Sequence, residues 1–151
     1  MDAKVSFGVD FLNIMGNADL KSGQSDNMNG FDLARLFLVT EWGLSLEEGD
    51  QANKLFWEQI NKKTLDGLDT VAERFISHLK KDPVACTKFL TQMITINFLD
   101  GEITDEERDF TMAFANDLDF RKSEVNVMVE KAVAYAAAYG FFGRNFKKNG
   151  K

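Results

Sequence analysis

Apolar residues recur at intervals of three and four along most of this chain, and this helical period restricts its fold more than any other feature. Such spacing places the apolar side chains on one face of a helix. The clearest stripe consists of Leu68, Val71, Ala72, Phe75, Ile76 and Leu79. Similar stripes occupy residues 29–43, 45–60, 82–99, 105–118 and 123–139. The sequence therefore predicts an all-α fold, a single compact bundle of about seven helices formed by residues 1–151.

Capping signals mark where these helices begin and end. In a capping box, Ser or Thr is followed three residues later by Glu, and each side chain bonds the other's backbone N–H. Three pairs fit this pattern: Ser45 with Glu48, Thr70 with Glu73, and Thr104 with Glu107. Asp82 can cap a further helix with Pro83 in its first turn, where the missing N–H costs nothing. Ser123 is predicted to begin the last helix, and Gly43 and Gly140 to end two helices.

The N-terminal part is harder to assign. Residues 4–15 alternate like a strand, but no second strand is available to pair with it, so we predict a helix there. Residues 16–30 are rich in Gly, Asn, Asp and Ser and predict a loop, so residues 1–30 are expected to be irregular apart from that helix. The helix over 82–99 is apolar almost all round and should be the central, most buried one.

Composition limits the class of protein. The single cysteine, Cys86, cannot form an internal disulfide or a cysteine-based zinc site, which suits a reducing compartment. The apolar run near the N-terminus is interrupted by Asp10 and Asn13 and lacks a cleavage pattern, so no secretory signal is predicted. No apolar run is long enough to span a bilayer. We predict a soluble, cytoplasmic protein.

The net charge of -6 is concentrated in one segment. Residues 100–119 hold eight acids and one Arg, so the rest of the chain sums to about +1, and a nucleic-acid partner is not expected there. The tail, residues 141–151, carries four basic residues and no acid, interleaved with Phe141, Phe142 and Phe146. That mixture fits either a peripheral contact with a membrane or acidic partner, or rings that complete the core.

The acidic loop at 100–107 is the main candidate site, although most of it has a structural explanation. Gly101 can end a helix, and Thr104 with Glu107 can cap the next one, whose first turn favours acids. Asp100 fits poorly, because a negative charge at a helix carboxyl end is unfavourable. Either it bonds loop amides or a cation lies nearby. A hard cation such as Ca²⁺ or Mg²⁺ would use these oxygens, with Asp100, Glu102, Asp105 and Glu107 as the predicted ligands.

An ordinary EF-hand is excluded for this loop. Aligning Gly101 with the invariant glycine places Asp100 and Glu107 at ligand positions five and twelve. Positions one and three would then be Ile96 and Phe98, which are apolar. Two obligatory ligands are missing, so a tight calcium site built from this loop alone is not expected.

The stretch "KDPVACTKFLTQMITINFLDGEITDEERDFTMAFANDLDF" resembles the TerB-like tellurite-resistance family. The resemblance covers residues 82 to about 120 and rests on a short pattern. In it, an apolar helix runs into Asp-Gly, and after a short spacer an acidic helix start with a Glu leads into a further apolar helix that ends in a leucine-containing turn. Asp100, Gly101, Glu107 and Leu118 occupy its positions. It implies a compact helical domain with two helix–Asp-Gly–helix pseudo-repeats, clustered acids that bind a divalent metal, and a non-enzymatic role in stress-response complexes.

The first pseudo-repeat departs from that pattern. Asp19 follows an apolar segment, but Leu20 replaces the glycine and the loop is longer. Asp26 and Asp32 are the residues that could fill the acidic roles. This departure weakens the expectation of a metal site shared by two repeats.

Other chemistry is weakly indicated. His78, the only histidine, lies at the edge of an apolar stripe, where a structural role is the more frequent one. Cys86 lies near a helix start, which could lower its pKa, but no partner base is evident and we interpret it as a small buried apolar residue. No phosphate-binding loop or nucleophile elbow occurs.

Three functions stay open at this point. The first is a non-enzymatic TerB-like module that contacts a protein partner and holds a divalent cation weakly at 100–107. The second is a structural domain whose acidic face docks a basic partner without metal. The third, a hydrolase with paired carboxylates, needs two acids flanking a pocket, and an exposed loop does not favour it.

Overall fold

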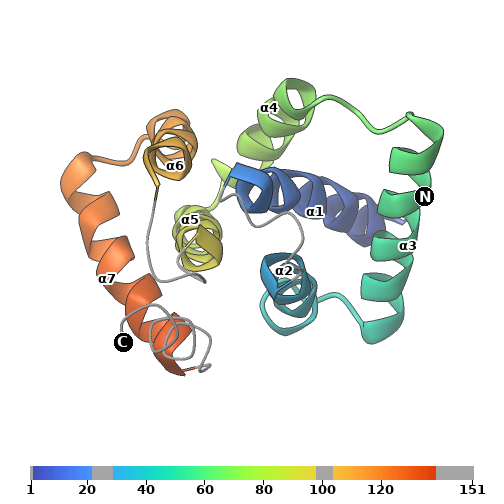
Figure 1. Cartoon of the computed structure of the whole chain (residues 1–151), viewed down its shortest axis with the longest axis horizontal. Coiled ribbons are helices and arrows are strands. Elements are labelled where there is room, and N and C mark those ends of the chain that lie inside the picture. Colours follow the sequence, from blue (N-terminus) through green and yellow to red (C-terminus); the bar gives the residue numbers. More distant parts are fainter. Residues whose placement is uncertain (1, 22–28, 98–103, 139–151) are drawn as a thin grey trace.

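The computed structural model describes residues 2–21, 29–97 and 104–138 of the chain. These segments form seven helices and no strand (Figure 1), so the predicted all-α bundle is confirmed for the described residues. The helices are α1 (Ala3–Lys21), α2 (Asn29–Thr40), α3 (Leu46–Lys62), α4 (Leu68–Leu79), α5 (Pro83–Asn97), α6 (Asp105–Asp117) and α7 (Lys122–Ala138). Gly101, on which the predicted second pseudo-repeat depends, lies outside the described residues.

Helix α5 lies in the middle of the molecule. Figure 1 shows α1 and its neighbours α2, α3 and α4 on one side of α5, and α6 and α7 on the other. Phe89, Leu90, Met93 and Ile94 are fully buried. A helix that is apolar nearly all round can be satisfied only by neighbours on several faces, and the predicted central position is confirmed.

Helix α1 is a helix and not a strand, as expected, and it organises the N-terminal half. Its residues Phe11, Leu12, Ile14 and Met15 are fully buried, and it packs against α2, α3, α4 and α5. The predicted loop at 16–30 is wrong over its first residues, because α1 continues to Lys21. Burial of the preceding turns stabilises this extension despite the polar composition of the segment.

Two of the three predicted capping boxes are present. The Glu48 N–H donates to Ser45 Oγ (3.0 Å) and the Ser45 N–H donates to Glu48 Oε1 (2.9 Å). Thr104 and Glu107 form the same reciprocal pair at the start of α6. Asp82 caps α5 as predicted. Its Oδ1 accepts from the Val84 N–H at 3.0 Å, and Pro83 is the first residue of the helix.

The box predicted at Thr70 and Glu73 is wrong. Helix α4 begins at Leu68 with Gly67 as its N-cap, and no side chain caps it. Leu68 is partly buried against the core, so packing starts the helix two residues before the capping signal. Helix α7 likewise begins at Lys122, one residue before the predicted Ser123, and the Arg121 N–H donates to Glu124 Oε1 at 2.8 Å.

Two further details differ from the sequence prediction. Helix α2 ends at Thr40 and not at Gly43, although Gly43 has a positive φ of 77° in the turn that follows. Within the predicted stripe at 105–118, Ala113 is exposed whereas Ala115 is fully buried. Ala115 lies four residues after the buried Thr111, and residues at this spacing share one face of a helix. Gly140 lies outside the described residues.

Candidate functional site

A groove with an aromatic floor lies between α1, α4 and the turn that follows α2. Its volume is about 650 Å³, within the range of sites that bind small molecules or side chains of a partner. We call it the α1–α4 groove, and it is lined by Ala3, Lys4, Ser6, Phe7, Asp10, Trp42, Leu44, Arg74, Phe75 and His78. The groove joins three segments of the chain that are far apart in sequence.

The floor of the groove is a cluster of rings around Phe7. The centroid of Phe7 lies 5.0 Å from that of Phe75, 5.2 Å from Trp42 and 6.0 Å from His78, the last in an edge-on arrangement. Phe7 occupies α1, and Phe75 and His78 lie one turn apart on α4. Ring pairs at these separations attract one another beyond their burial, so the floor is a well-packed surface.

Two residues of α5, Gln92 and Lys88, contact Trp42. The indole N–H of Trp42 donates to Gln92 Oε1 at 2.7 Å, and Gln92 is 5% exposed. The ammonium of Lys88 lies 4.3 Å from the centre of the Trp42 ring and donates to the Glu41 carbonyl oxygen at 2.6 Å. A buried indole N–H needs such an acceptor, and together these contacts fix one ring orientation.

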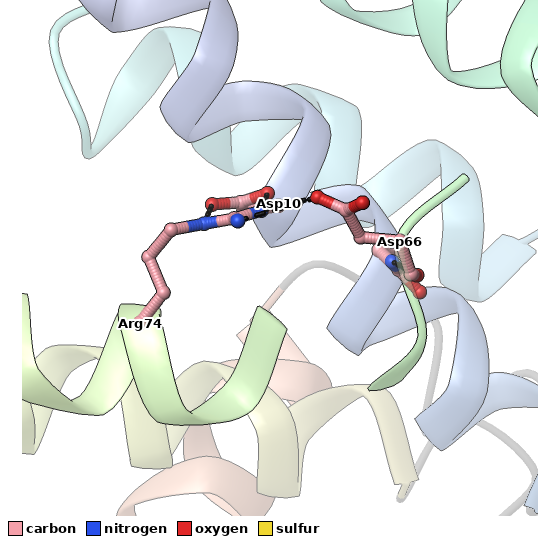
Figure 2. Close-up of polar contacts among 4 residues, drawn as sticks. Asp10, Asp66 and Arg74 are labelled. Carbon is pink, nitrogen blue, oxygen red and sulfur yellow. Dashed lines mark hydrogen bonds and ion pairs between the residues drawn. The ribbon is translucent and has the colours of Figure 1, made fainter. Parts of the chain in front are cut away.

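Charged residues form the rim of the groove. Figure 2 shows the contacts of one of them, Arg74, with Asp10 and Asp66. The Arg74 guanidinium donates to both carboxylate oxygens of Asp10, from Nε at 2.9 Å and from Nη2 at 2.7 Å. Its Nη1 and Nη2 atoms also donate to Asp66 Oδ2, each at 3.2 Å. The hydrogen bond with Asp10 is the main cause that raises the pKa of Arg74 above its usual value. The guanidinium is therefore permanently charged and bridges α1, α4 and the connection before α4.

The Asp66 carboxylate is the accessible negative group of this network. One guanidinium faces two carboxylates, and the Asp66 side chain is 58% exposed whereas that of Asp10 is 15% exposed. The Asn13 amide donates to the Asp66 backbone oxygen at 3.1 Å and so helps to fix the connection. A smaller cavity of about 370 Å³, lined in part by Asp10, Asp66 and Gln59, adjoins the network. A cationic group of a partner would find Asp66 accessible here.

The structure describes two of the four predicted metal ligands. The Asp105 side chain is 96% exposed and lies 3.7 Å from the Arg108 guanidinium. Glu107 is fully buried, and its Oε1 accepts from the Thr104 N–H at 2.7 Å. The two carboxylates therefore occupy different environments and do not form a ligand pair by themselves. Asp100 and Glu102 lie outside the described residues, so the four-residue site stays a prediction.

The first acidic segment is described only in part. Asp32 is exposed in the first turn of α2, where its charge suits the helix dipole. Asp19 is within α1, and Asp26 lies outside the described residues. Within the segments 2–21, 29–97 and 104–138, no group of three or more His, Cys, Asp or Glu side chains could hold a metal ion.

His78 and Cys86 have distinct surroundings. His78 is exposed and contributes to the groove through its contact with Phe7. Cys86 is 5% exposed, its Sγ lies 3.1 Å from the Leu79 carbonyl oxygen, and burial raises the pKa of the thiol. The interpretation of Cys86 as a small buried residue is confirmed. Burial and, after it, the nearby Asp82 carboxylate raise the pKa of the thiol, opposite to the direction that its position near a helix start suggested.

Sequence reasoning did not identify the residues of the groove rim. In the sequence, Asp10 is a charged residue that interrupts an apolar run. Arg74 is a polar residue next to the apolar stripe at 68–79. The two are separated by 64 positions, and a single sequence contains no signal that pairs them.

Comparison with known proteins adds no identification. No family model matches the chain, and neither a curated protein nor a solved structure matches it. The TerB-like resemblance accordingly stays a prediction. None of the described helices combines the length and apolar character needed to cross a membrane. The tail at 141–151, on which the predicted peripheral membrane contact rests, lies outside the described residues.

Proposed function

We propose that this chain is a non-enzymatic helical module that binds a protein partner in the α1–α4 groove. The observation that carries the proposal is the aromatic floor, in which Phe7, Trp42 and Phe75 meet beneath an open groove of about 650 Å³. Aromatic anchors in a preformed hollow are typical of protein-binding surfaces. A binding module of this kind is also what the TerB-like resemblance implies.

The polar groups of the groove favour binding over catalysis. Asp10 and Arg74 bond to each other, and the Lys4 ammonium donates to the Gly43 carbonyl oxygen at 3.1 Å. Groups committed in this way orient a partner but are poorly suited to exchanging protons with a substrate. We therefore assign them a positioning role at the rim.

The charge of the rim indicates the chemistry of the partner. The Asp66 side chain is 58% exposed and shares the Arg74 guanidinium with Asp10, and the chain as a whole carries -6. A segment with an aromatic or large aliphatic side chain for the floor and a nearby Lys or Arg for Asp66 fits both features. Electrostatic attraction would also speed its association at low salt.

Selection from a displayed peptide library tests this proposal. We expect enrichment of peptides that pair an aromatic anchor with a basic residue, measured afterwards by anisotropy of labelled synthetic peptides. Ala3→Trp fills the groove from an exposed position at its edge, and Ala113→Trp adds the same ring at an exposed site on α6. Binding should fall at least about tenfold in the first variant and stay unchanged in the second.

Asp66→Asn separates the charge effect from the apolar one. This variant should weaken binding by about threefold to tenfold at low salt and much less at high salt. Equal affinity of the selected peptides for wild-type protein and Ala3→Trp would refute the groove as the site. Peptides without aromatic or basic enrichment would refute the proposed partner.

The acidic loop is the second proposed site, for a weakly held divalent cation. The burial of Glu107 at the start of α6 is the structural feature that supports it, since a carboxylate inside a protein gains from a nearby positive charge. Calorimetric titration with Ca²⁺, Mg²⁺ and Mn²⁺ tests the site. Binding in the millimolar range that is lost in Asp100→Asn with Glu102→Gln is expected; absence of heat at millimolar metal would remove the cation and leave the groove proposal unaffected.

A further inference from the structure

A second cavity lies on the opposite side of α5, between α5, α6 and α7. Its volume is about 620 Å³, and we call it the α6–α7 cavity. Both α6 and α7 pack on α5 (Figure 1), and the turn that joins them leads the two helices away from each other. The cavity is lined by Ile94, Arg108, Asp109, Thr111, Met112, Lys122, Val125, Asn126 and Val129.

The inner wall of this cavity is apolar. Ile94 is fully buried, Val125 is 5% exposed, and Met112 and Val129 are partly buried against the core. These side chains come from all three helices and face one space. Methionine and branched aliphatic residues accept a flexible hydrocarbon chain readily, because they offer contact area without demanding a particular ring geometry.

Basic residues outnumber acidic ones in the lining of the cavity. Arg108 on α6 and Lys122 at the start of α7 line it, together with a single acid, Asp109. The Arg108 side chain is 64% exposed, and its contact with Asp105 is a long surface pair of 3.7 Å. Such a pair is weak, so the guanidinium can bind another carboxylate.

A hydroxyl group adds a further polar contact inside. Thr111 is 5% exposed and its Oγ1 accepts from the Asn97 amide at 2.8 Å. The Thr111 hydroxyl oxygen is the acceptor in that bond. In the described part of the chain, the hydroxyl group itself donates no hydrogen bond. A carboxylate at this position could accept from Thr111 and from the Arg108 fork.

We propose that the α6–α7 cavity binds a medium-chain aliphatic carboxylate. The hydrocarbon chain would lie on Ile94, Met112 and Val129, and the carboxylate would lie at the mouth near Arg108 and Lys122. An acidic peptide would satisfy the same cations, but an apolar wall contributed by three helices fits a hydrocarbon chain better than a peptide backbone with its own polar groups. This site is independent of the α1–α4 groove.

A chain-length series with hexanoate, octanoate and decanoate, kept below their micelle concentrations, tests the proposal by calorimetry and amide chemical shifts. Affinity should rise about threefold to fourfold for each added methylene group, and the shifts should map to residues of the three helices. 1-Decanol should bind at least about fivefold more weakly than decanoate if the carboxylate is recognised.

Variants locate the site. Arg108→Gln with Lys122→Gln should weaken decanoate binding at least about tenfold, whereas Lys131→Gln, an exposed lysine of α7 outside the cavity, should not change it. Met112→Trp should block binding of decanol and decanoate alike. No saturable binding of decanoate would overturn the proposal. So would binding that survives the double variant and Met112→Trp, or that is lost in Ala3→Trp, which would assign the ligand to the α1–α4 groove.

Discussion

Two glycines on α1 should respond in opposite directions when each is replaced by alanine. A Cβ on Gly8 would lie 2.7 Å from the Cβ of Ala52 and 3.2 Å from Leu44 Cδ2, whereas a Cβ on Gly16 would meet only Phe56 Cζ at 3.8 Å. The methyl group of Ala52 is attached directly to the α3 backbone and cannot rotate away. Gly8→Ala therefore forces α1 and α3 apart.

The magnitude follows from two opposing terms. Alanine stabilises a helix interior by about 1 kcal/mol relative to glycine, and overpacking a buried contact costs about 1–3 kcal/mol. The free energy of unfolding should fall by up to about 2 kcal/mol in Gly8→Ala and rise by about 0.5–1 kcal/mol in Gly16→Ala. For a chain of this length, each kcal/mol moves the melting temperature by about 2–4 °C.

Urea and thermal unfolding followed by circular dichroism measure both changes. Ala52→Gly combined with Gly8→Ala removes the clash, so the double variant should recover about 1–2 kcal/mol relative to the sum of the single effects. Stabilisation by Gly8→Ala equal to that by Gly16→Ala would refute the close approach of α1 and α3 at this position.

Three other predictions concern the rim, the thiol and the helix caps. Arg74→Met leaves the largely buried Asp10 carboxylate without its bidentate partner and should lower stability by about 1–2 kcal/mol in urea unfolding; a double-mutant cycle with Asp10→Asn should show coupling between the two. Because burial raises the pKa of the Cys86 thiol above its unfolded value near 8.5, its contribution is fully present below about pH 8.5 and is lost as the pH rises further; Cys86→Ala should flatten the alkaline side of the stability profile. Thr104→Ala should cost about 1 kcal/mol and Thr70→Ala much less in the same unfolding assay, since only the first caps a helix.

Local signals explain why much of the fold could be predicted from the sequence. The capping boxes at Ser45 and Thr104 depend on side chains and backbone groups within three residues of each other, so a single segment determines them. Helix α5 similarly has apolar residues on nearly all its faces, and this local pattern predicts its central position. The box predicted at Thr70 failed because the partly buried Leu68 extends α4, and that burial depends on other helices.

The candidate site could not be predicted in the same way, because its parts are distant in the chain. The groove requires α1 and α4 to lie side by side, and the contact between Asp10 and Arg74 exists only after that packing. The sequence indicated the acidic loop at 100–107 as a site, because a cluster of acidic residues can be recognised without knowing the fold. Of its four predicted ligands, the two described carboxylates show one exposed and one engaged in a cap.

The support of Trp42 by α5 makes the α1–α4 groove a preformed site. Trp42 packs against Phe7 and Phe11, with centroids at 5.2 and 5.9 Å, and its indole N–H donates to buried Gln92. A ring held by neighbouring rings and at its polar atom has little freedom to lose on binding, and this lowers the entropic cost of association. Amide shifts on binding a selected peptide should therefore remain confined to the groove. Replacing Gln92 with Leu should weaken peptide binding while α5 stays folded, because the indole loses the acceptor that orients it.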